Sequence, residues 1–280
     1  MQRRSDERVQ ALLDALLEDR SAPGLAARAS AGLGLPEQGR YAVAVLRTGD
    51  GPDRPVMDAD GMTFLRRMRA DCEIVVVALG ERDTDELTAV LVDRFPGPGG
   101  ISPVVESLAE LGSARRLADV ALLTCPPGTA RIVRLEERLP AALVVSRPEL
   151  AARLVASVFG PLLGLDPADR ELLVRTLEAW LDCGGSAGRA AGLLYCHRNT
   201  VLNRLRRLEQ LTSRSLSRPR ELIEIMLALE AFRLSVAAQR WGGGGPGAPP
   251  AGPPPTRVFR TAVRRPGAAQ WCPRSLPTAS

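Results

Sequence analysis

The chain has 280 residues, enough for two domains of ordinary size, and 45% of them are hydrophobic, which is normal for a globular protein. Its formal net charge of +5 is unevenly spread, because residues 1–183 carry 22 arginines and 28 acidic residues, whereas residues 184–240 carry ten arginines and four glutamates. Positive charge confined to one region favours an anionic partner, such as nucleic acid, for that region alone.

Composition also excludes several classes of protein. No run of about 18 apolar residues is present to cross a membrane, and the N-terminal MQRRSDERVQ lacks the apolar core of a secretion signal. The five cysteines form no C-x-x-C pair, so we expect reduced thiols in a cytoplasmic protein that does not contact a membrane. No catalytic triad, phosphate loop or metal cluster is visible. We therefore expect a protein that is not an enzyme, with no catalytic residues, no metal and no cofactor.

Residues 1–34 are expected to form N-terminal helices. Within residues 6–20, apolar side chains recur at the spacing of one helix face, at Val9, Leu12, Leu13, Leu16 and Leu17. This stripe could cap the following domain or pair with a second copy of the chain, and we favour the dimer contact. A second helix is expected over residues 22–33.

Residues 35–140 are expected to form an α/β or α+β domain. The β-branched run at 73–79 (EIVVVAL) is the clearest strand signal in the chain. Three more strands are expected at 41–47, 101–105 and 131–135. Helices are expected at 63–70, 83–95 and 108–123, with a loop at 48–60.

The region that follows is expected to be helical. Ser146 and Glu149 have the spacing of a capping box, and Gly160-Pro161 is expected to end the next helix, so that residues 141–165 form a linker helix. Asp166 as N-cap and Pro167 at the first helical position predict the start of an all-α domain over residues 166–236.

Apolar stripes predict the core of this all-α domain. The stripe of its first helix consists of Leu173, Leu177, Trp180 and Leu181, and that of its last helix consists of Leu222, Ile225, Met226, Leu229 and Phe232. Residues 241–280 are rich in glycine, proline and arginine and are expected to be a disordered tail.

Between these two helices, residues 184–211 (GGSAGRAAGLLYCHRNTVLNRLRRLEQL) have the pattern of a helix-turn-helix. Two glycines end one helix, a short alanine-rich helix follows, and a longer arginine-rich helix begins at HRNT. Val201, Leu205 and Leu208 fall on one face of this second helix, so that face is expected to pack inward.

The start of the second helix carries the side chains from which we expect contacts to DNA. They are Arg198, Asn199, Thr200 and Asn203. Side chains near the start of a recognition helix reach base edges, where arginine suits guanine and asparagine suits adenine.

The arginines further along the helix, Arg204, Arg206 and Arg207, are expected to neutralise phosphates. His197, the single histidine, is expected to pack at the helix start or to touch a phosphate rather than to bind metal. Cys196 beside it is expected to be a small buried residue of the turn. The alternative is that this is only a solvated face, because the chain uses arginine throughout and contains no lysine.

These residues also support a family resemblance. Residues 169–234 resemble the C-terminal DNA-binding domain of the PucR/CdaR-type bacterial transcription regulators, through LLVRTLEAWLD, the Gly184-Gly185 pair, HRNT at 197–200 and LRRLE at 205–209. The resemblance implies double-stranded DNA as a partner, a homodimer and a small-molecule effector. This chain departs from the family in the first helix of the motif, where Ser186 replaces the usual asparagine and Gly188 and Gly192 interrupt the helix.

Residues 35–135 resemble the degenerate GGDEF-like domain that precedes the DNA-binding domain in many of these regulators, through VVVALGERD and GGISPVVESLAELGSARRLADVALL. The acidic signature of an active cyclase is absent, because Gly99-Gly100 is followed by Ile101 and Ser102. Asp58 and Asp60 are the acids that could hold Mg²⁺, although a solvated loop explains them better. The resemblance therefore implies a non-catalytic sensor or dimerisation domain.

The sequence thus predicts a sequence-specific DNA-binding transcription regulator. Two alternatives remain open at this point. One is a nucleotide-processing enzyme that uses the GGDEF-like domain as a degenerate cyclase. The other is a metabolite- or nucleotide-binding protein whose DNA-binding domain has been weakened by Gly188 and Gly192.

Overall fold

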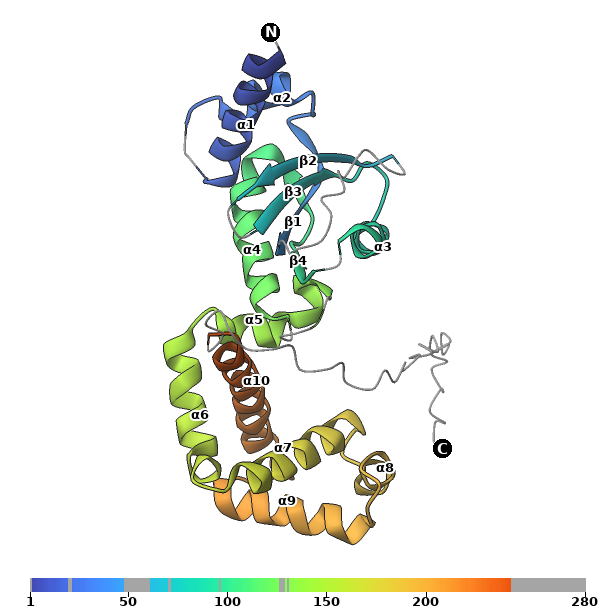
Figure 1. The fold of residues 1–280 in the computed structure, drawn as a ribbon, viewed down its shortest axis with the longest axis vertical. Coiled ribbons are helices and arrows are strands. Elements are labelled where there is room, and N and C mark those ends of the chain that lie inside the picture. The colour runs from blue at the N-terminus through green and yellow to red at the C-terminus, as the bar shows by residue number, and fades with distance from the viewer. Residues whose placement is uncertain are drawn as a thin grey trace, which may run out of the picture. The chain divides into compact units, whose positions relative to one another are not determined.

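The computed structural model describes residues 2–19, 22–47, 61–69, 72–95, 97–125, 129 and 131–242, and Figure 1 shows them as a ribbon. The expected loop at 48–60, with Asp58 and Asp60, lies outside the described residues, as does nearly all of the expected tail. Within the described part of the chain, no helix is long and apolar enough to cross a membrane.

A mixed sheet forms the centre of the N-terminal part. Its strands are β1 (Gln38–Arg47), β2 (Thr63–Met68), β3 (Cys72–Ala78), β4 (Gly99–Ile101), β5 (Val105–Ser107) and β6 (Ile132–Arg134). The order is β2-β3-β1-β4-β6, with β5 pairing to β1, and all pairs are antiparallel except β4 with β6. The α+β form of the predicted fold is therefore the one observed.

Strand β1 lies inside this sheet, and helices cover both of its faces. Side chains alternate along a strand, so Val43 and Val45 enter one core cluster while Ala42 and Ala44 enter another. The first cluster is closed by α1 (Gln2–Leu17), α2 (Leu25–Leu33) and α4 (Leu111–Leu123), the last preceded by a 3₁₀ turn, η1 (Leu108–Glu110). The second is closed by α3 (Thr84–Arg94).

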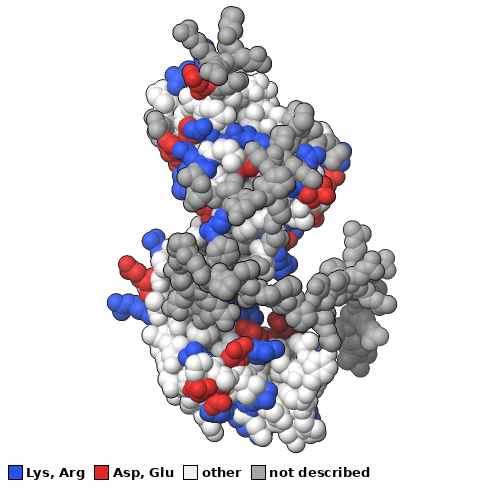
Figure 2. All heavy atoms as spheres, in the orientation of Figure 1, with Lys and Arg blue, Asp and Glu red and all other residues white. Residues whose placement is uncertain are grey.

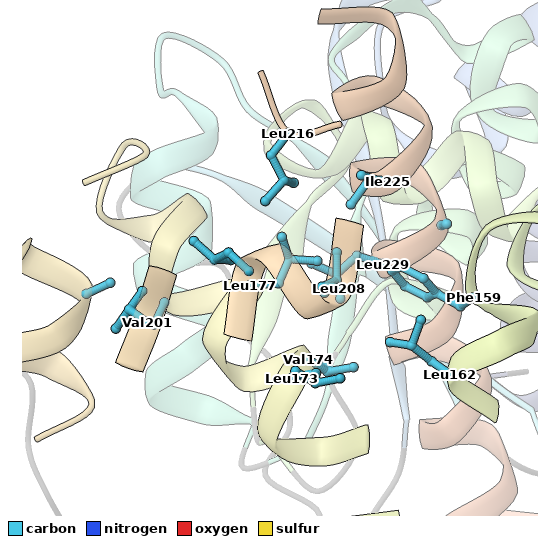
Figure 3. Close-up of a cluster of buried hydrophobic side chains, with 14 of the residues drawn as sticks. Phe159, Leu162, Leu173, Val174, Leu177, Val201, Leu208, Leu216, Ile225 and Leu229 are labelled. Atoms are coloured by element: carbon cyan, nitrogen blue, oxygen red, sulfur yellow. The ribbon is translucent and has the colours of Figure 1, made fainter. Parts of the chain in front are cut away.

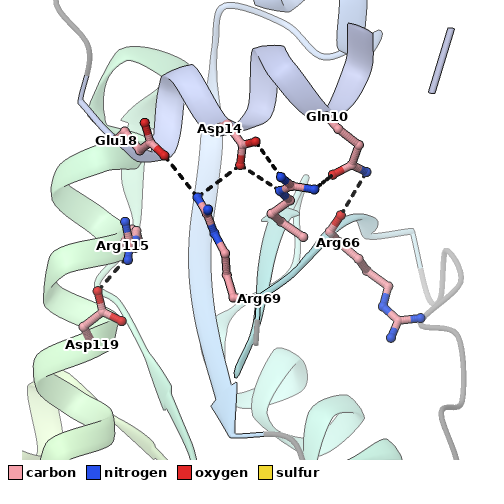
Figure 4. Close-up of polar contacts among 8 residues, drawn as sticks. Gln10, Asp14, Glu18, Arg66, Arg69, Arg115 and Asp119 are labelled. Carbon is pink, nitrogen blue, oxygen red and sulfur yellow. Dashed lines mark hydrogen bonds and ion pairs between the residues drawn. The ribbon is translucent and has the colours of Figure 1, made fainter. Parts of the chain in front are cut away.

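Helix α1 packs on the sheet of its own chain. Its Leu13, Leu16 and Leu17 are buried in the first cluster. Asp14 also forms two ion pairs (Figure 4). One is with Arg67, which lies in β2, at 2.7 Å, and the other is with Arg69, which follows β2, at 3.2 Å. The interpretation of this stripe as a cap on the domain is confirmed. The favoured dimer contact through these leucines is wrong, because their surface is already used within the chain.

Two local predictions in the sheet are wrong. A helix was expected at 63–70, but residues 63–68 form β2, because pairing with β3 from Thr63↔Ala78 to Met68↔Glu73 satisfies the backbone and overrides local preference. The single strand expected at 101–105 is divided between β4 and β5. Between them, the Ser102 hydroxyl accepts a hydrogen bond of 2.9 Å from the Val43 amide in β1. The expected strands at 41–47, 73–79 and 131–135 and the helices at 83–95 and 108–123 are confirmed within a few residues.

The C-terminal part is entirely helical. After the 3₁₀ turn η2 (Leu135–Arg138) it contains α5 (Leu139–Val145), α6 (Pro148–Leu163), α7 (Pro167–Asp182), α8 (Ala187–Leu193), α9 (Arg198–Thr212) and α10 (Pro219–Gly242). One hydrophobic cluster joins α6 to α10 (Figure 3). Within it, the rings of Phe159 on α6 and Phe232 on α10 meet edge to face at 6.0 Å.

The start and end predicted for α6 are wrong. No side chain caps its N-terminus, and the Ser146 hydroxyl instead donates to the Ala142 carbonyl at the end of α5, at 2.7 Å. Pro161 lies inside α6, in its last turn, so the helix continues to Leu163. Continuation is favoured because Leu162 is buried in the helical core. The Asp166 cap of α7 is confirmed, since its carboxylate accepts from the Ala168 amide at 2.9 Å.

Gly100 gives a test of the sheet packing. A Cβ at this position would overlap the backbone of Ala118 and Leu122 in α4, which cannot yield as a flexible side chain does. We expect Gly100→Ala to lower the free energy of unfolding by at least about 1–3 kcal/mol, measured by urea denaturation of the full chain.

Gly188→Ala is the matched control. A Cβ at Gly188 meets nothing within 4 Å, and alanine in a helix is favoured over glycine by roughly 0.5–1 kcal/mol. The control should therefore be at least as stable as the unmodified chain. Equal stability of the Gly100→Ala variant and the unmodified chain would contradict this packing.

Candidate nucleic-acid interface

Helix α9 is oriented by one buried apolar stripe. Val201, Leu205 and Leu208 are 0%, 5% and 0% exposed and belong to the core formed with α6, α7, α8 and α10 (Figure 3). Trp180 of α7 is half-buried and packs against the same core, as expected. The predicted helix-turn-helix is therefore confirmed in α8 and α9, with the stripe turned inward.

The glycine pair before α8 makes the turn that places it. Gly184 and Gly185 have φ values of 61° and 78°, in the left-handed region that glycine adopts without steric cost. A Cβ on Gly185 would lie 3.4 Å from the Trp180 ring, so the turn packs directly on α7. Ser186 then caps α8, its hydroxyl accepting from the Arg189 amide at 3.4 Å. The serine that replaces the family asparagine is therefore the N-cap residue of α8.

The turn between α8 and α9 closes α8 with two backbone hydrogen bonds. The Tyr195 amide donates to the Gly192 carbonyl at 3.4 Å and the Cys196 amide donates to the Ala191 carbonyl at 3.0 Å. This is the Schellman arrangement, in which the residue after the helix adopts the left-handed conformation. Here that residue is Tyr195, with a φ of 52°. Cys196 is half-buried against the helical core and its thiol is free, in keeping with its expected place in the turn.

His197 begins α9. It is the N-cap residue, and its Nδ1 accepts a hydrogen bond of 3.2 Å from the Asn199 amide. The predicted position at the helix start is therefore confirmed. The side chains of Arg198 and Asn199 lie at this helix N-terminus, where the helix dipole favours an anion.

The exposed face of α9 gathers three of the predicted side chains. Asn199, Asn203 and Arg206 are exposed opposite the buried stripe, and Arg206 donates to the Asn203 side-chain oxygen at 3.2 Å. This pairing orients an amide and a guanidinium side by side, which are the groups that bind adenine and guanine edges. In the view of Figure 2, basic side chains lie among acidic and uncharged ones over the lower part of the surface, where α9 runs in Figure 1.

The remaining candidates flank this face. Arg198 is exposed, whereas Thr200 and Arg204 are half-buried on the other flank of the helix. Arg207 forms an ion pair of 3.0 Å with Asp169 of α7, so part of its charge is balanced within the chain. Both side chains of that pair are 48% exposed, and pairs of this kind contribute about 0–1 kcal/mol. The pair therefore leaves the Arg207 guanidinium accessible to a phosphate.

A groove of about 780 Å³ runs beside the exposed face, between the start of α8 and one flank of α9. Arg198 and Arg206 line it from α9, Gly185 and Ser186 line it from the turn before α8, and Ser217 lines it from the loop after α9. Glu209 lines it as well, so the charged groups of this groove are two guanidinium groups and one carboxylate.

Sequence reasoning missed the loop that braces the end of α9. The Glu209 carboxylate accepts from the Leu216 amide at 2.8 Å and from the Ser215 hydroxyl at 3.2 Å. Hydrogen bonding from the Ser215 amide, followed by the pairing with Arg218, holds the pKa of Glu221 below its ordinary value. Glu209 was the available signal in the sequence, because an acidic residue inside an arginine-rich helix suggests a hydrogen-bond partner within the chain.

Tyr195 provides a test of the turn. A bulky residue in the left-handed region carries a steric cost that glycine does not. We expect Tyr195→Gly to raise the free energy of unfolding by about 1 kcal/mol, measured by urea denaturation. Tyr195→Ala removes the ring but keeps the strained backbone, so it should bring no such gain. A glycine variant no more stable than the alanine variant would contradict the strain.

Comparisons with known proteins agree with this geometry. The family model of the PucR C-terminal helix-turn-helix domain matches residues 173–231, and that of the GGDEF-like domain matches residues 18–124. The second match begins within the N-terminal helices, ahead of the expected domain start at residue 35. Both resemblances inferred from the motifs are therefore confirmed.

Related sequences cover part of the chain. An uncharacterized protein from the pkwA 5′ region of Thermomonospora curvata is 32% identical over 158 residues, which are 55% of this chain and 86% of that protein. Uncharacterized proteins of Mycobacterium bovis and Mycobacterium tuberculosis are 27% identical over 155 residues, which are 55% of this chain. The chain spans only 36% of the length of these mycobacterial relatives.

A solved structure, the regulator of polyketide synthase expression from Bifidobacterium adolescentis, aligns with 81% of this chain and 92% of its own, at 19% identity and a TM-score of 0.38. The two family models and the Thermomonospora relative carry the assignment without it. The chain therefore belongs to the PucR/CdaR-type family of bacterial transcription regulators.

Proposed function

We propose that this protein regulates transcription by binding a specific double-stranded DNA sequence through residues 166–236. The observation that carries the proposal is that α9 has one buried apolar face and one exposed polar face. Its buried stripe fixes the helix in the core, while Asn199, Asn203 and Arg206 remain exposed on the opposite face. A helix held in this way presents amide and guanidinium groups to a major groove without disturbing its own packing.

The other arginines are proposed to supply affinity rather than specificity. Arg198 lines the groove beside α8, and Arg204 and Arg207 lie on the flanks of the helix. Contacts of arginine to phosphate position a protein on DNA and make its binding sensitive to salt. Arg198 is the first residue of α9, where it can reach a base edge or the adjacent phosphate.

The test is a titration of the full chain with DNA from its own upstream region, at two salt concentrations and with competitor DNA. Saturable binding that survives competitor is expected. The double variant Arg198→Ala with Asn199→Ala should bind that DNA at least about 10-fold more weakly, since even a single lost base contact costs about 1–3 kcal/mol.

Arg153→Ala is the matched control. Arg153 is exposed on α6, so its replacement removes the same charge from another helix and should leave specific affinity within about twofold. Circular dichroism should be the same for all three proteins. Binding of the double variant that equals that of the unmodified chain would contradict the assigned interface.

We further propose that residues 35–140 bind or dimerise without catalysing a reaction. The packing of Gly100 against α4 supports this, because it accounts for the glycine pair by close backbone approach rather than by nucleotide binding. The test is incubation of the chain with nucleoside triphosphates and Mg²⁺. Formation of a product that depends on an acidic residue of this domain would overturn the proposal.

A homodimer and a small-molecule effector complete the proposed function. Helix-turn-helix proteins commonly read two half-sites about 34 Å apart as dimers. The mass of the chain in solution, measured by light scattering with and without DNA, tests the dimer directly. A single monomer on each DNA fragment would exclude it.

A further inference from the structure

Tyr195 has a backbone conformation that its side chain does not favour. It occupies the position after α8 where a Schellman turn needs the left-handed region, with a φ of 52°. Glycine adopts this conformation freely, and a bulky side chain does so at a steric cost. The two hydrogen bonds of the turn, to Gly192 and Ala191, hold the residue there.

Burial does not offset that cost. The Tyr195 side chain is 85% exposed, the largest value among the exposed large hydrophobic side chains of the described residues. An aromatic ring contributes to folding mainly by leaving water, and this ring does not leave it. A contact with a partner molecule therefore explains a tyrosine at this position better than packing in the core does.

Its position shows what it can reach. Tyr195 lies two residues before His197, the N-cap of α9, at the same end of that helix as Arg198 and Asn199. The next residue, Cys196, packs against the helical core, so the turn is fixed relative to α9. The phenol is thus carried beside the N-terminus of the reading helix on a rigid support.

We propose that Tyr195 contacts the DNA backbone, its hydroxyl donating a hydrogen bond to a phosphate oxygen next to the groove that α9 enters. This inference rests on the proposed function. Tyrosine hydroxyls are among the donors that bind phosphates, and such contacts set the register of a protein on DNA without reading its sequence.

The experiment uses the full chain and two DNA fragments, its upstream region and an unrelated sequence of equal length. Tyr195→Phe keeps the ring and the backbone strain and removes only the hydroxyl. We expect it to weaken binding to both fragments by a similar factor of about two to ten, as for the loss of one hydrogen bond. Tyr195→Gly should weaken binding at least as much although its unfolding midpoint rises.

Ser213→Gly is the matched control. Ser213 ends α9 and is also in the left-handed region, with a φ of 52°, but it lies at the opposite end of the helix from Tyr195. Its replacement should raise the unfolding midpoint and leave DNA affinity unchanged. It therefore separates relief of strain from loss of a contact.

The proposal is overturned if Tyr195→Phe binds both fragments as tightly as the unmodified chain, whatever the affinity of Tyr195→Gly. It is also overturned if the loss is confined to one fragment, which would indicate a base contact. Failure of the proposed function gives a different result, in which the unmodified chain binds the two fragments equally. The phosphate contact is still measured in that case, because every DNA carries phosphates.

Discussion

The burial of Val201, Leu205 and Leu208 is the interaction on which the DNA-facing surface depends. These side chains are almost completely buried, and each contributes about 1.5–3 kcal/mol relative to an exposed one. The ion pair that ties the same helix to α7 through Arg207 contributes about 0–1 kcal/mol. Burial therefore determines how α9 is rotated about its axis. The polar residues on its opposite face are left exposed to solvent.

Small residues determine how closely the elements around this helix approach one another. Gly184 and Gly185 supply two successive left-handed residues and bring the turn onto Trp180, and Gly100 lets β4 lie against the backbone of α4. Tyr195 is the exception, because it takes a glycine-like conformation with a large exposed ring. A cost of about 1 kcal/mol at one residue is small beside the burial that holds the helix pair together. The domain can therefore carry a strained residue at its surface.

The sequence predicted the correct element where one local signal dominated. The stripe of α9, the β-branched run of β3 and the Asp166 cap of α7 each follow from short-range chemistry, and the structure agrees. The helix predicted at 63–70 was wrong because pairing with β3, which is a tertiary contact, determines the conformation of residues 63–68. The helix that contains Pro161 continues for the same reason, since the burial of Leu162 outweighs a local breaker in the last turn.

The sequence predicted the helix that carries the candidate site, but not the turn and the loop beside that helix. The spacing of HRNT and the arginines placed the polar face of α9, whereas the turn that strains Tyr195 and the loop held by Glu209 depend on hydrogen bonds that no periodicity reveals. Arg207 also has a partner, Asp169, that lies 38 positions away in the sequence. Contacts at such separations become visible only when the chain is folded.

Hydrogen–deuterium exchange of the full chain, with and without DNA from its upstream region, tests whether α9 reads DNA. We expect slower exchange on binding at the start of α8, in the turn at Tyr195 and along the first two turns of α9. We expect little change in the strands of the sheet. Protection confined to residues 38–134, or none in α9, would contradict the assignment of α9 as the helix that reads DNA.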